Sequence, residues 1–358
     1  MNKITSESGK IYIGMDVSQK KIEIFLLNAD SAEGHFLEIP NSRDSLLAFF
    51  QAIPEPSRCV AVLETGTHSH WQSRLLEGLG VDVIVAHARD LHLIWKSDRK
   101  TDRRDAEMLA RLARFDRKLL HPTRPLTRKQ QEDILLIKVR SSLVQKRTAM
   151  LNELRGWLRS IGEECNGLST EMMQKEFYGQ LPDALKRVFR EYLKVLAVLT
   201  RSIKEYDKAL EKKCKEYPET ESLRQVGGVG PVIALTFCLL IHDPYRFKNG
   251  RQVAAYFGLV PKRDQSGECD KQLGITKSGS SMMRWVLIQG ANYIMGQGKA
   301  CDLRRMGERI SARGGNIAKR KAKVAVARKL CMVLLALWRN DAVPYDPDYK
   351  LNRKKRIA

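Results

Sequence analysis

The chain has 358 residues, with 63 Lys or Arg against 41 Asp or Glu, which gives a formal net charge of +22 and a pI near 9.8. Such an excess of positive charge favours a polyanionic partner, most commonly nucleic acid. No apolar run approaches the roughly 18 residues of a membrane-spanning helix, and the N-terminal residues lack the apolar core of a signal peptide, so we expect neither a membrane-spanning nor a secreted protein.

Apolar runs in the first part of the chain predict the strands of an α/β domain. Two of them, IYIGMDV and KIEIFLL, flank a polar turn and predict a hairpin. Two later runs, CVAVLE and VDVIVAH, are almost entirely apolar, which is typical of parallel strands buried on both faces. Strands are expected at 11–17, 21–27, 35–40, 59–64 and 81–87, and helices at 43–53, 71–80 and 101–115. The sheet should therefore begin antiparallel and continue with parallel strands.

From about residue 127 the apolar residues recur with heptad spacing. Two sets lie seven residues apart: Leu136, Leu143, Met150 and Trp157, and Ile137, Val144, Leu151 and Leu158. A later set alternates steps of four and three: Leu185, Phe189, Tyr192, Leu196, Leu199, Ile203, Tyr206 and Leu210. This spacing predicts two long coiled-coil helices, and it does not decide whether they pair within the chain or between subunits.

The C-terminal part begins with a compact unit at 222–300 and ends in a strongly basic segment. Its last 58 residues hold 16 Lys or Arg and 5 Asp or Glu, which is half of the net charge. Basic runs such as 319–329 and 353–356 are often only a solvated face, but this concentration favours contact with a polyanion. We expect three parts: an α/β domain (1–125), a coiled-coil region (126–217) and a mainly α C-terminal domain (218–358).

Seven cysteines are present, an odd number, and none forms a CxxC pair. This usage predicts free thiols in a reducing compartment and no zinc site. Together with the missing signal peptide it predicts a cytoplasmic protein, associated with the nucleoid when bound to DNA.

Four carboxylates occupy positions from which they could converge. Asp16 and Glu64 stand at the ends of predicted strands, where ligands bind in α/β sheets. Asp102 and Asp105 share one face of a predicted helix. Each also has an ordinary explanation, namely a turn, a loop start, or the positive end of a helix dipole.

The joint arrangement favours a metal site over these separate explanations. Converging carboxylates would raise one another's pKa unless cations neutralised them, and hard oxygen ligands select Mg²⁺ or Mn²⁺. Many enzymes that cleave or transfer phosphodiesters use two such ions about 4 Å apart.

Several blocks of the sequence carry a family resemblance: YIGMDVSQKKIEIFLL, AVLETGTHSHWQSRLLEGLG, VIVAHARDLHLIWKSDRKTDRRDAEMLARLA, and QVGGVGPVIALTF with GLVPKRDQSGECDKQLGITKSG. Together they resemble the DEDD transposases of the insertion sequence 110 family over nearly the whole chain. The resemblance implies a ribonuclease-H-like N-terminal domain akin to Holliday-junction resolvases, then coiled-coil helices and a mainly α C-terminal transposase domain.

The resemblance also implies site residues. Carried onto this chain, the metal-binding tetrad is Asp16, Glu64, Asp102 and Asp105. Asp98 lies outside the motif and should be dispensable. Arg103 and Arg104 stand beside the tetrad, where they could meet phosphates.

A serine nucleophile is implied in the C-terminal domain, and the matching position is Ser266. Serine before glycine is also ordinary turn chemistry. The nearby rivals are Ser278, Ser280 and Ser281, and the chain departs from many relatives at Glu268, Cys269 and Asp270.

Two further features of the C-terminal domain suggest phosphate contacts. Gly228 and Gly230 resemble the turn of a helix-hairpin-helix, which brings backbone N–H groups to a phosphate, although a glycine-capped helix would look the same. Lys277 and Arg284 lie near Ser266 in sequence and could steady a scissile phosphate.

The function expected is a DNA transposase that acts as a site-specific recombinase on double-stranded DNA through a phosphoserine intermediate. The resemblance further implies an element-encoded structured guide RNA and a homo-oligomer, either a dimer or a tetramer. One alternative is a metal-dependent junction-resolving nuclease without a covalent intermediate. Another is an architectural nucleic-acid-binding protein with a degenerate catalytic domain.

Overall fold

A computed structural model of the chain describes residues 9–87, 101–163, 181–266, 269–349 and 352, with the backbone alone for 263–266 and 269–272. The chain forms two compact units, Met1–Gln131 and Glu132–Ala358. The division into three parts stays a prediction, because the long helices and the C-terminal body fall in one unit.

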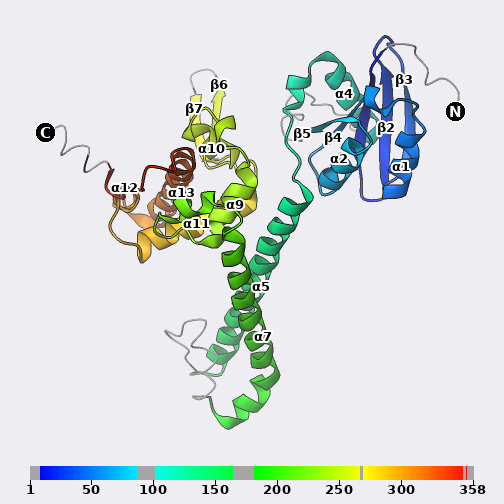
Figure 1. The fold of residues 1–358 in the computed structure, drawn as a ribbon. Helices are drawn as coiled ribbons and strands as arrows, with labels where there is room; N and C mark the ends of the chain where they lie inside the picture. The colour runs from blue at the N-terminus through cyan, green and yellow to red at the C-terminus, as the bar shows by residue number, and fades with distance from the viewer. Residues whose placement is uncertain (1–8, 88–100, 164–180, 267–268, 350–351, 353–358) are drawn as a thin grey trace. The chain divides into compact units, whose positions relative to one another are not determined.

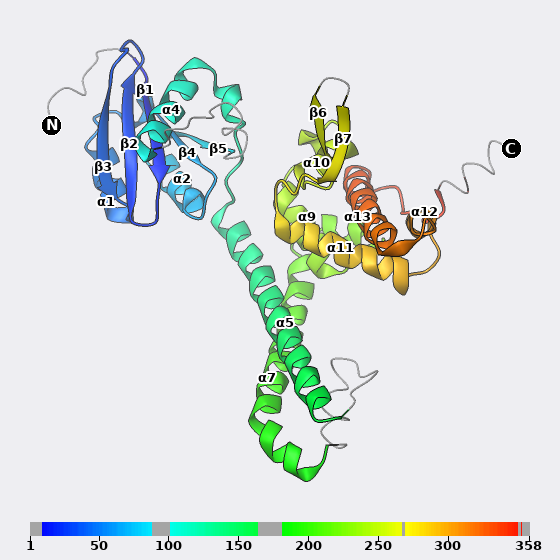
Figure 2. The same cartoon turned by 180° about the vertical axis from the view of Figure 1, so that it is seen from behind.

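The first unit is built on a five-stranded sheet with the order β3-β2-β1-β4-β5 (Figure 2). The first three strands pair antiparallel, whereas β4 and β5 continue parallel to β1. The strands are β1 (Ile11–Val17), β2 (Lys21–Asn28), β3 (Gly34–Pro40), β4 (Cys59–Glu64) and β5 (Asp82–Ala86). This order confirms the predicted ribonuclease-H-like sheet.

Helices cover both faces of this sheet (Figure 1). The helices of the first unit are α1 (Arg43–Gln51), α2 (Ser69–Glu77) and α4 (Asp102–Phe115), with short 3₁₀ turns at Pro56–Arg58 and Arg117–Leu120. Ile13 and Met15 of β1 are buried on the face that α1 and α2 cover. The alternate residues of the sheet, such as Val60 and Val62, pack against α4.

Gly14 sets the distance between β1 and α4. A Cβ atom at this position would lie 1.8 Å from the backbone oxygen of Ala106 and 2.8 Å from the nitrogen of Ala110. Only a residue without a side chain therefore lets the helix backbone rest directly on the strand.

Two long helices, α5 (Arg128–Ser160) and α7 (Asp183–Cys214), pack antiparallel against each other (Figure 1). Ile137, Leu151 and Leu158 of one predicted set are buried in α5, and so are Ile134 and Leu154, which lie outside both sets. Val144 of the first set is half-buried, and Trp157 of the other set is 45% exposed. In α7 the buried set is Phe189, Leu196, Ile203 and Leu210, joined by Leu193 and Thr200. The helices thus pair within the chain, which the spacing alone left open.

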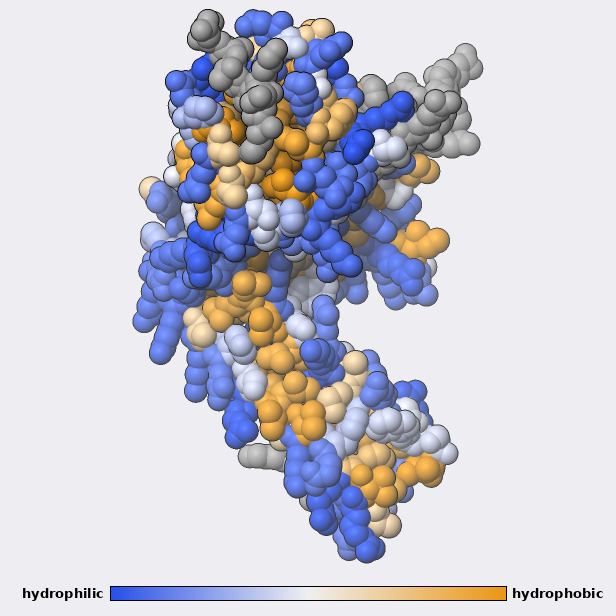
Figure 3. All heavy atoms as spheres, turned by 90° about the vertical axis from the view of Figure 1, so that its right-hand side faces the viewer, coloured by the Kyte–Doolittle hydropathy of each residue, from blue (hydrophilic) through white to orange (hydrophobic). Residues whose placement is uncertain are grey.

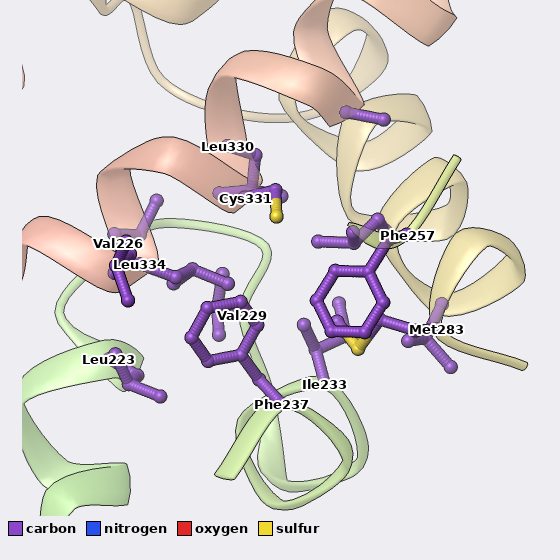
Figure 4. Packing of buried hydrophobic residues seen from close by; sticks show 14 of the residues in the cluster. Leu223, Val226, Val229, Ile233, Phe237, Phe257, Met283, Leu330, Cys331 and Leu334 are labelled. Carbon is purple, nitrogen blue, oxygen red and sulfur yellow. The ribbon is translucent and has the colours of Figure 1, made fainter. Parts of the chain in front are cut away.

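The C-terminal body encloses one large apolar core, in which Phe237 and Phe257 face Leu330 and Leu334 (Figure 4). Its helices are α8 (Glu219–Arg224), α9 (Pro231–Ile241), α10 (Gly250–Tyr256), α11 (Ser281–Gly296), α12 (Asp302–Ser311) and α13 (Gly315–Arg339), with a 3₁₀ turn at Pro244–Arg246. A hairpin of β6 (Pro261–Ser266) and β7 (Cys269–Ile275) projects from it (Figure 2).

Five cysteines with described side chains are free thiols, and four of them are buried. Burial raises the pKa of the Cys59 thiol to about 11 and raises the pKa of Cys331 further. Cys59 and Cys331 are therefore protonated and poorly reactive at neutral pH.

We expect Gly14→Ala to lower the free energy of unfolding of the first unit by about 3 kcal/mol, because the new methyl group overlaps the backbone of α4. Gly66→Ala is the matched control, since the nearest atom to its Cβ lies 3.9 Å away. Chemical denaturation of both variants tests this, and equal stability of the two would contradict it.

Candidate active site

Two of the predicted carboxylates lie on neighbouring parallel strands. Met15 of β1 is in register with Leu63 of β4, so Asp16 and Glu64 come next at the carboxyl ends of these strands. Asp16 lies two residues beyond Gly14, which faces α4, and Glu64 lies two residues beyond Val62, which packs against α4. Alternation along a strand therefore places both on the face that α4 covers.

The other two carboxylates stand in the first turn of α4, at the same end of the sheet. Nε of Arg103 in this turn lies 3.7 Å from Glu23, the residue opposite Asp16. At the other end of the helix, Arg114 donates a hydrogen bond to the carbonyl of Asn28, which pairs with Ile11. The helix thus runs antiparallel to β1 and brings Asp102 and Asp105 toward the strand ends.

We call Asp16, Glu64, Asp102 and Asp105 the carboxylate edge. Asp102 is exposed and the other three are half-buried. Within the described part of the chain, no three carboxylate, imidazole or thiolate side chains stand close enough together to hold an ion. The donor set nevertheless fits Mg²⁺ or Mn²⁺, since it consists only of carboxylate oxygens gathered at one end of one face.

Glu23 is a fifth carboxylate at this edge, and the sequence analysis missed it. Its exposed fraction is 5%, and it pairs across the strands with Asp16. Oε1 accepts a hydrogen bond from Nζ of Lys21 at 2.9 Å, whereas Oε2 accepts none among the described residues and lies 3.7 Å from Nε of Arg103. Hydrogen bonds to Glu38 and Glu23 raise the pKa of Lys21 above its ordinary value. Glu23 thus adds a buried negative charge to this edge, with Lys21 and Arg103 as its cationic neighbours.

The two arginines beside the edge differ in their surroundings. The guanidinium of Arg103 lies 5.8 Å from the centre of the Phe36 ring, near Glu23, with 67% of its side chain exposed. Arg104 is exposed, and its backbone N–H is bound by the Thr101 side chain at 3.4 Å. Their contact with phosphates stays a prediction.

Ser266 is the last residue of β6 and pairs with Cys269 at the tip of the β6–β7 hairpin. At the foot of the hairpin the GLVP and ITKSG segments of one motif block come into backbone contact. A Cβ at Gly258 would lie 2.2 Å from the nitrogen of Ser278, and one at Gly279 would lie 2.1 Å from the oxygen of Tyr256. Both glycines have φ near +65°, so these positions disfavour any other residue.

The rival serines have visible structural roles nearby. Ser280 caps α11, because its hydroxyl accepts a hydrogen bond from the N–H of Met283. The hydroxyl of Ser278 lies 3.0 Å from that of Thr276. Ser281 is exposed as the first residue of α11. A structural reason thus exists for two of the three rivals.

Arg284 and Lys277 are parts of the same turn. One nitrogen of Arg284, Nη1, donates to the carbonyls of Phe257, Ser278 and Gly279, which ties α11 to the hairpin foot. Lys277 is exposed, has φ of +55°, and donates its backbone N–H to Gly258. Their contact with a scissile phosphate stays a prediction.

The two predicted phosphate-binding glycines lie between α8 and α9. Gly228 has φ of +88°, and a Cβ there would lie 2.8 Å from the Tyr293 ring. Gly230 caps α9 and would have open space around a Cβ. A glycine-containing turn thus joins two helices here, and both the helix-hairpin-helix motif and its phosphate binding stay predictions.

Comparison with known proteins decides which family these features belong to. A family model described as a transposase, of the DEDD IS110 type, matches residues 13–163, and the model of the transposase IS116/IS110/IS902 family matches residues 220–302. Over 293 residues the chain is 30% identical to the transposase for insertion sequence element IS1111A of Coxiella burnetii, covering 78% of this chain and 77% of that protein. The chain belongs to the IS116/IS110/IS902 transposase family.

A second relative of this transposase is the transposase for insertion sequence element IS1328 of Yersinia enterocolitica. It is 24% identical, and the match covers 79% of this chain and 83% of the relative. As a family member, the protein is an enzyme that acts on DNA. The matched region 13–163 contains the whole carboxylate edge, and the region 220–302 contains Ser266. Among the described residues, the transposase has no helix long and apolar enough to cross a membrane.

We expect Thr101→Ala to lower the stability of the first unit by about 1 kcal/mol and to loosen the first turn of α4. The Thr101 hydroxyl caps this helix, and loss of such a cap typically has this effect. Thr101→Ser keeps the hydroxyl and should match the wild type. Denaturation with amide hydrogen exchange in α4 tests this, and equal exchange in both variants would contradict it.

Proposed function

We propose that this transposase is a site-specific recombinase that cuts and rejoins double-stranded DNA through a phosphoserine intermediate. The observation that carries most weight is the carboxylate edge, where two strands and one helix end bring four acids to one face. Its parts would be the catalytic domain (1–125), the helical region (126–217) and the C-terminal transposase domain (218–358).

The carboxylate edge would hold the divalent cation, with Mg²⁺ or Mn²⁺ as the candidates. When bound, such ions neutralise charge on phosphate oxygens and activate the attacking oxygen. The protein's own contribution is to keep four carboxylates in place on a rigid sheet and a capped helix. Arg103 and Arg104 add positive charge at the rim, where a phosphate backbone would approach.

Ser266 would supply the nucleophile. Its Oγ attacks phosphorus, the bond from phosphorus to one deoxyribose oxygen breaks, and that oxygen leaves as a hydroxyl after taking up a proton. The proton of the serine hydroxyl passes to a basic group, and the leaving deoxyribose oxygen takes up a proton in its place. Because a phosphodiester is exchanged for another phosphodiester, a second strand's hydroxyl can reverse the step and rejoin the DNA.

The same proposal includes a guide RNA and a homo-oligomer. A structured RNA would select the target, and a homo-oligomer, either a dimer or a tetramer, would bring active sites together. In support, α7 exposes a second apolar stripe, with Val188, Val195 and Val198 between 49% and 71% exposed. Figure 3 shows apolar side chains on the outer surface of the α5–α7 pair. Apolar stripes at this spacing suit a partner helix.

We expect a covalent protein–DNA adduct that Ser266→Ala abolishes. Protein, element-encoded RNA and labelled junction DNA would be incubated with Mg²⁺ and resolved on a denaturing gel. Ser281→Ala is the control, since this exposed serine has the same chemistry on α11. Cleaved DNA without an adduct, unchanged by Ser266→Ala, would instead support a junction-resolving nuclease.

We expect Asp102→Asn to reduce strand cleavage at least about a hundredfold, since loss of one carboxylate weakens both cation binding and charge stabilisation. Asp98→Asn removes the same charge four residues away and should retain activity; Asp98 itself lies outside the described residues. Cation affinity, measured by calorimetry with Mn²⁺, should fall only in the Asp102 variant. Equal cleavage by the two variants would remove Asp102 from the site.

A further inference from the structure

A cavity of about 840 Å³ lies at the foot of the β6–β7 hairpin. Its walls come from α10, α12, α13 and the inner ends of both hairpin strands. One stripe of α13 lines it, because Lys321, Val324, Arg328 and Met332 recur at helical spacing. Segments far apart in the sequence therefore build this space together.

The rim of the cavity is strongly basic. Six cationic side chains line it, and no carboxylate is among its described lining residues. The cations are Arg251, Arg313, Arg320, Lys321, Arg328 and Lys329. Like charges gathered around one space repel each other, and a bound polyanion would relieve this repulsion.

The wall of the cavity is apolar, which phosphate binding alone does not explain. Leu259, Ile275, Met306 and Val324 contribute to it, and Leu273 is 46% exposed there. A duplex keeps the faces of its bases stacked inside, so it offers no base face to an apolar wall. An unpaired nucleotide presents both a phosphate and an apolar base face.

We propose that this cavity binds an unpaired nucleotide of DNA or RNA, with its base against the apolar wall and its phosphates at the cationic rim. The inference rests on the protein acting on nucleic acid, as proposed above, but on neither Ser266 nor the carboxylate edge. Ser266 stands at the opposite end of β6, about 16 Å along the strand from Pro261. The cavity is thus a binding site separate from the nucleophile.

The first test uses the wild-type protein and fluorescence anisotropy with labelled single strands of DNA and of RNA. Each is compared with an abasic strand of the same length and charge. The base-containing strand should bind about tenfold more tightly, the effect of holding one base against a protein surface. Equal affinity for base-containing and abasic strands would overturn the proposal, and the DNA and RNA arms tell which polymer is preferred.

The second test fills the cavity. Ala325→Phe places a ring on the wall from α13, and Gly274→Phe does so from β7, where a Cβ has no atom within 4 Å. Either folded variant should lose the preference for bases while duplex binding is unchanged. A preference that persists in a folded filled variant would place the base elsewhere and overturn the proposal.

A charge control separates the rim from the rest of the basic surface. Lys321→Ala should weaken single-strand binding and lower its salt dependence by about one counterion. Lys323→Ala removes an exposed charge from the same helix outside the cavity and should have a smaller effect. Equal losses in the two variants would count against a site at the cavity. Binding at the cavity needs no strand cleavage. If the base preference is observed but no serine adduct forms, the proposed phosphoserine chemistry is wrong and the cavity proposal stands.

Discussion

The direct contact between α4 and β1 at Gly14 is the constraint on which the first unit depends. With the helix backbone resting on the strand, the first turn of α4 is brought to the carboxyl ends of β1 and β4. The carboxylates of two strands and one helix then share an end and a face of the sheet. Without this close approach, Asp102 and Asp105 would be ordinary acidic residues at a helix N-terminus, stabilised by the dipole and nothing more.

A similar close approach organises the C-terminal body. Gly258 and Gly279 bring the GLVP and ITKSG blocks into backbone contact, and Arg284 ties the resulting turn to α11 through three carbonyls. This holds the β6–β7 hairpin on a rigid base, with Ser266 at its tip and the basic cavity at its foot. Gly258, Gly279 and Arg284 thus position the hairpin on the rest of this body.

Charge is distributed unevenly between these features. The carboxylate edge gathers acids at one end of the sheet, whereas six cationic side chains line the cavity without an acidic one among its described lining residues. The net charge of +22 gives only the sum of these opposed arrangements.

The sequence by itself determined the positions of the strands, the change from antiparallel to parallel pairing and the acids at the strand ends, because alternation and apolar runs are local properties of the chain. It also predicted two sets of residues in α5 that could lie buried against a partner helix. Ile137 of one set is buried and Leu136 of the other is half-buried, which is decided only by the packing of α7 against α5. The tertiary structure alone decided that Glu23 lies opposite Asp16, that Arg284 binds three carbonyls, and that a basic cavity exists at all. Each of these depends on strand register or on contacts between distant segments, and a one-dimensional pattern does not contain such contacts.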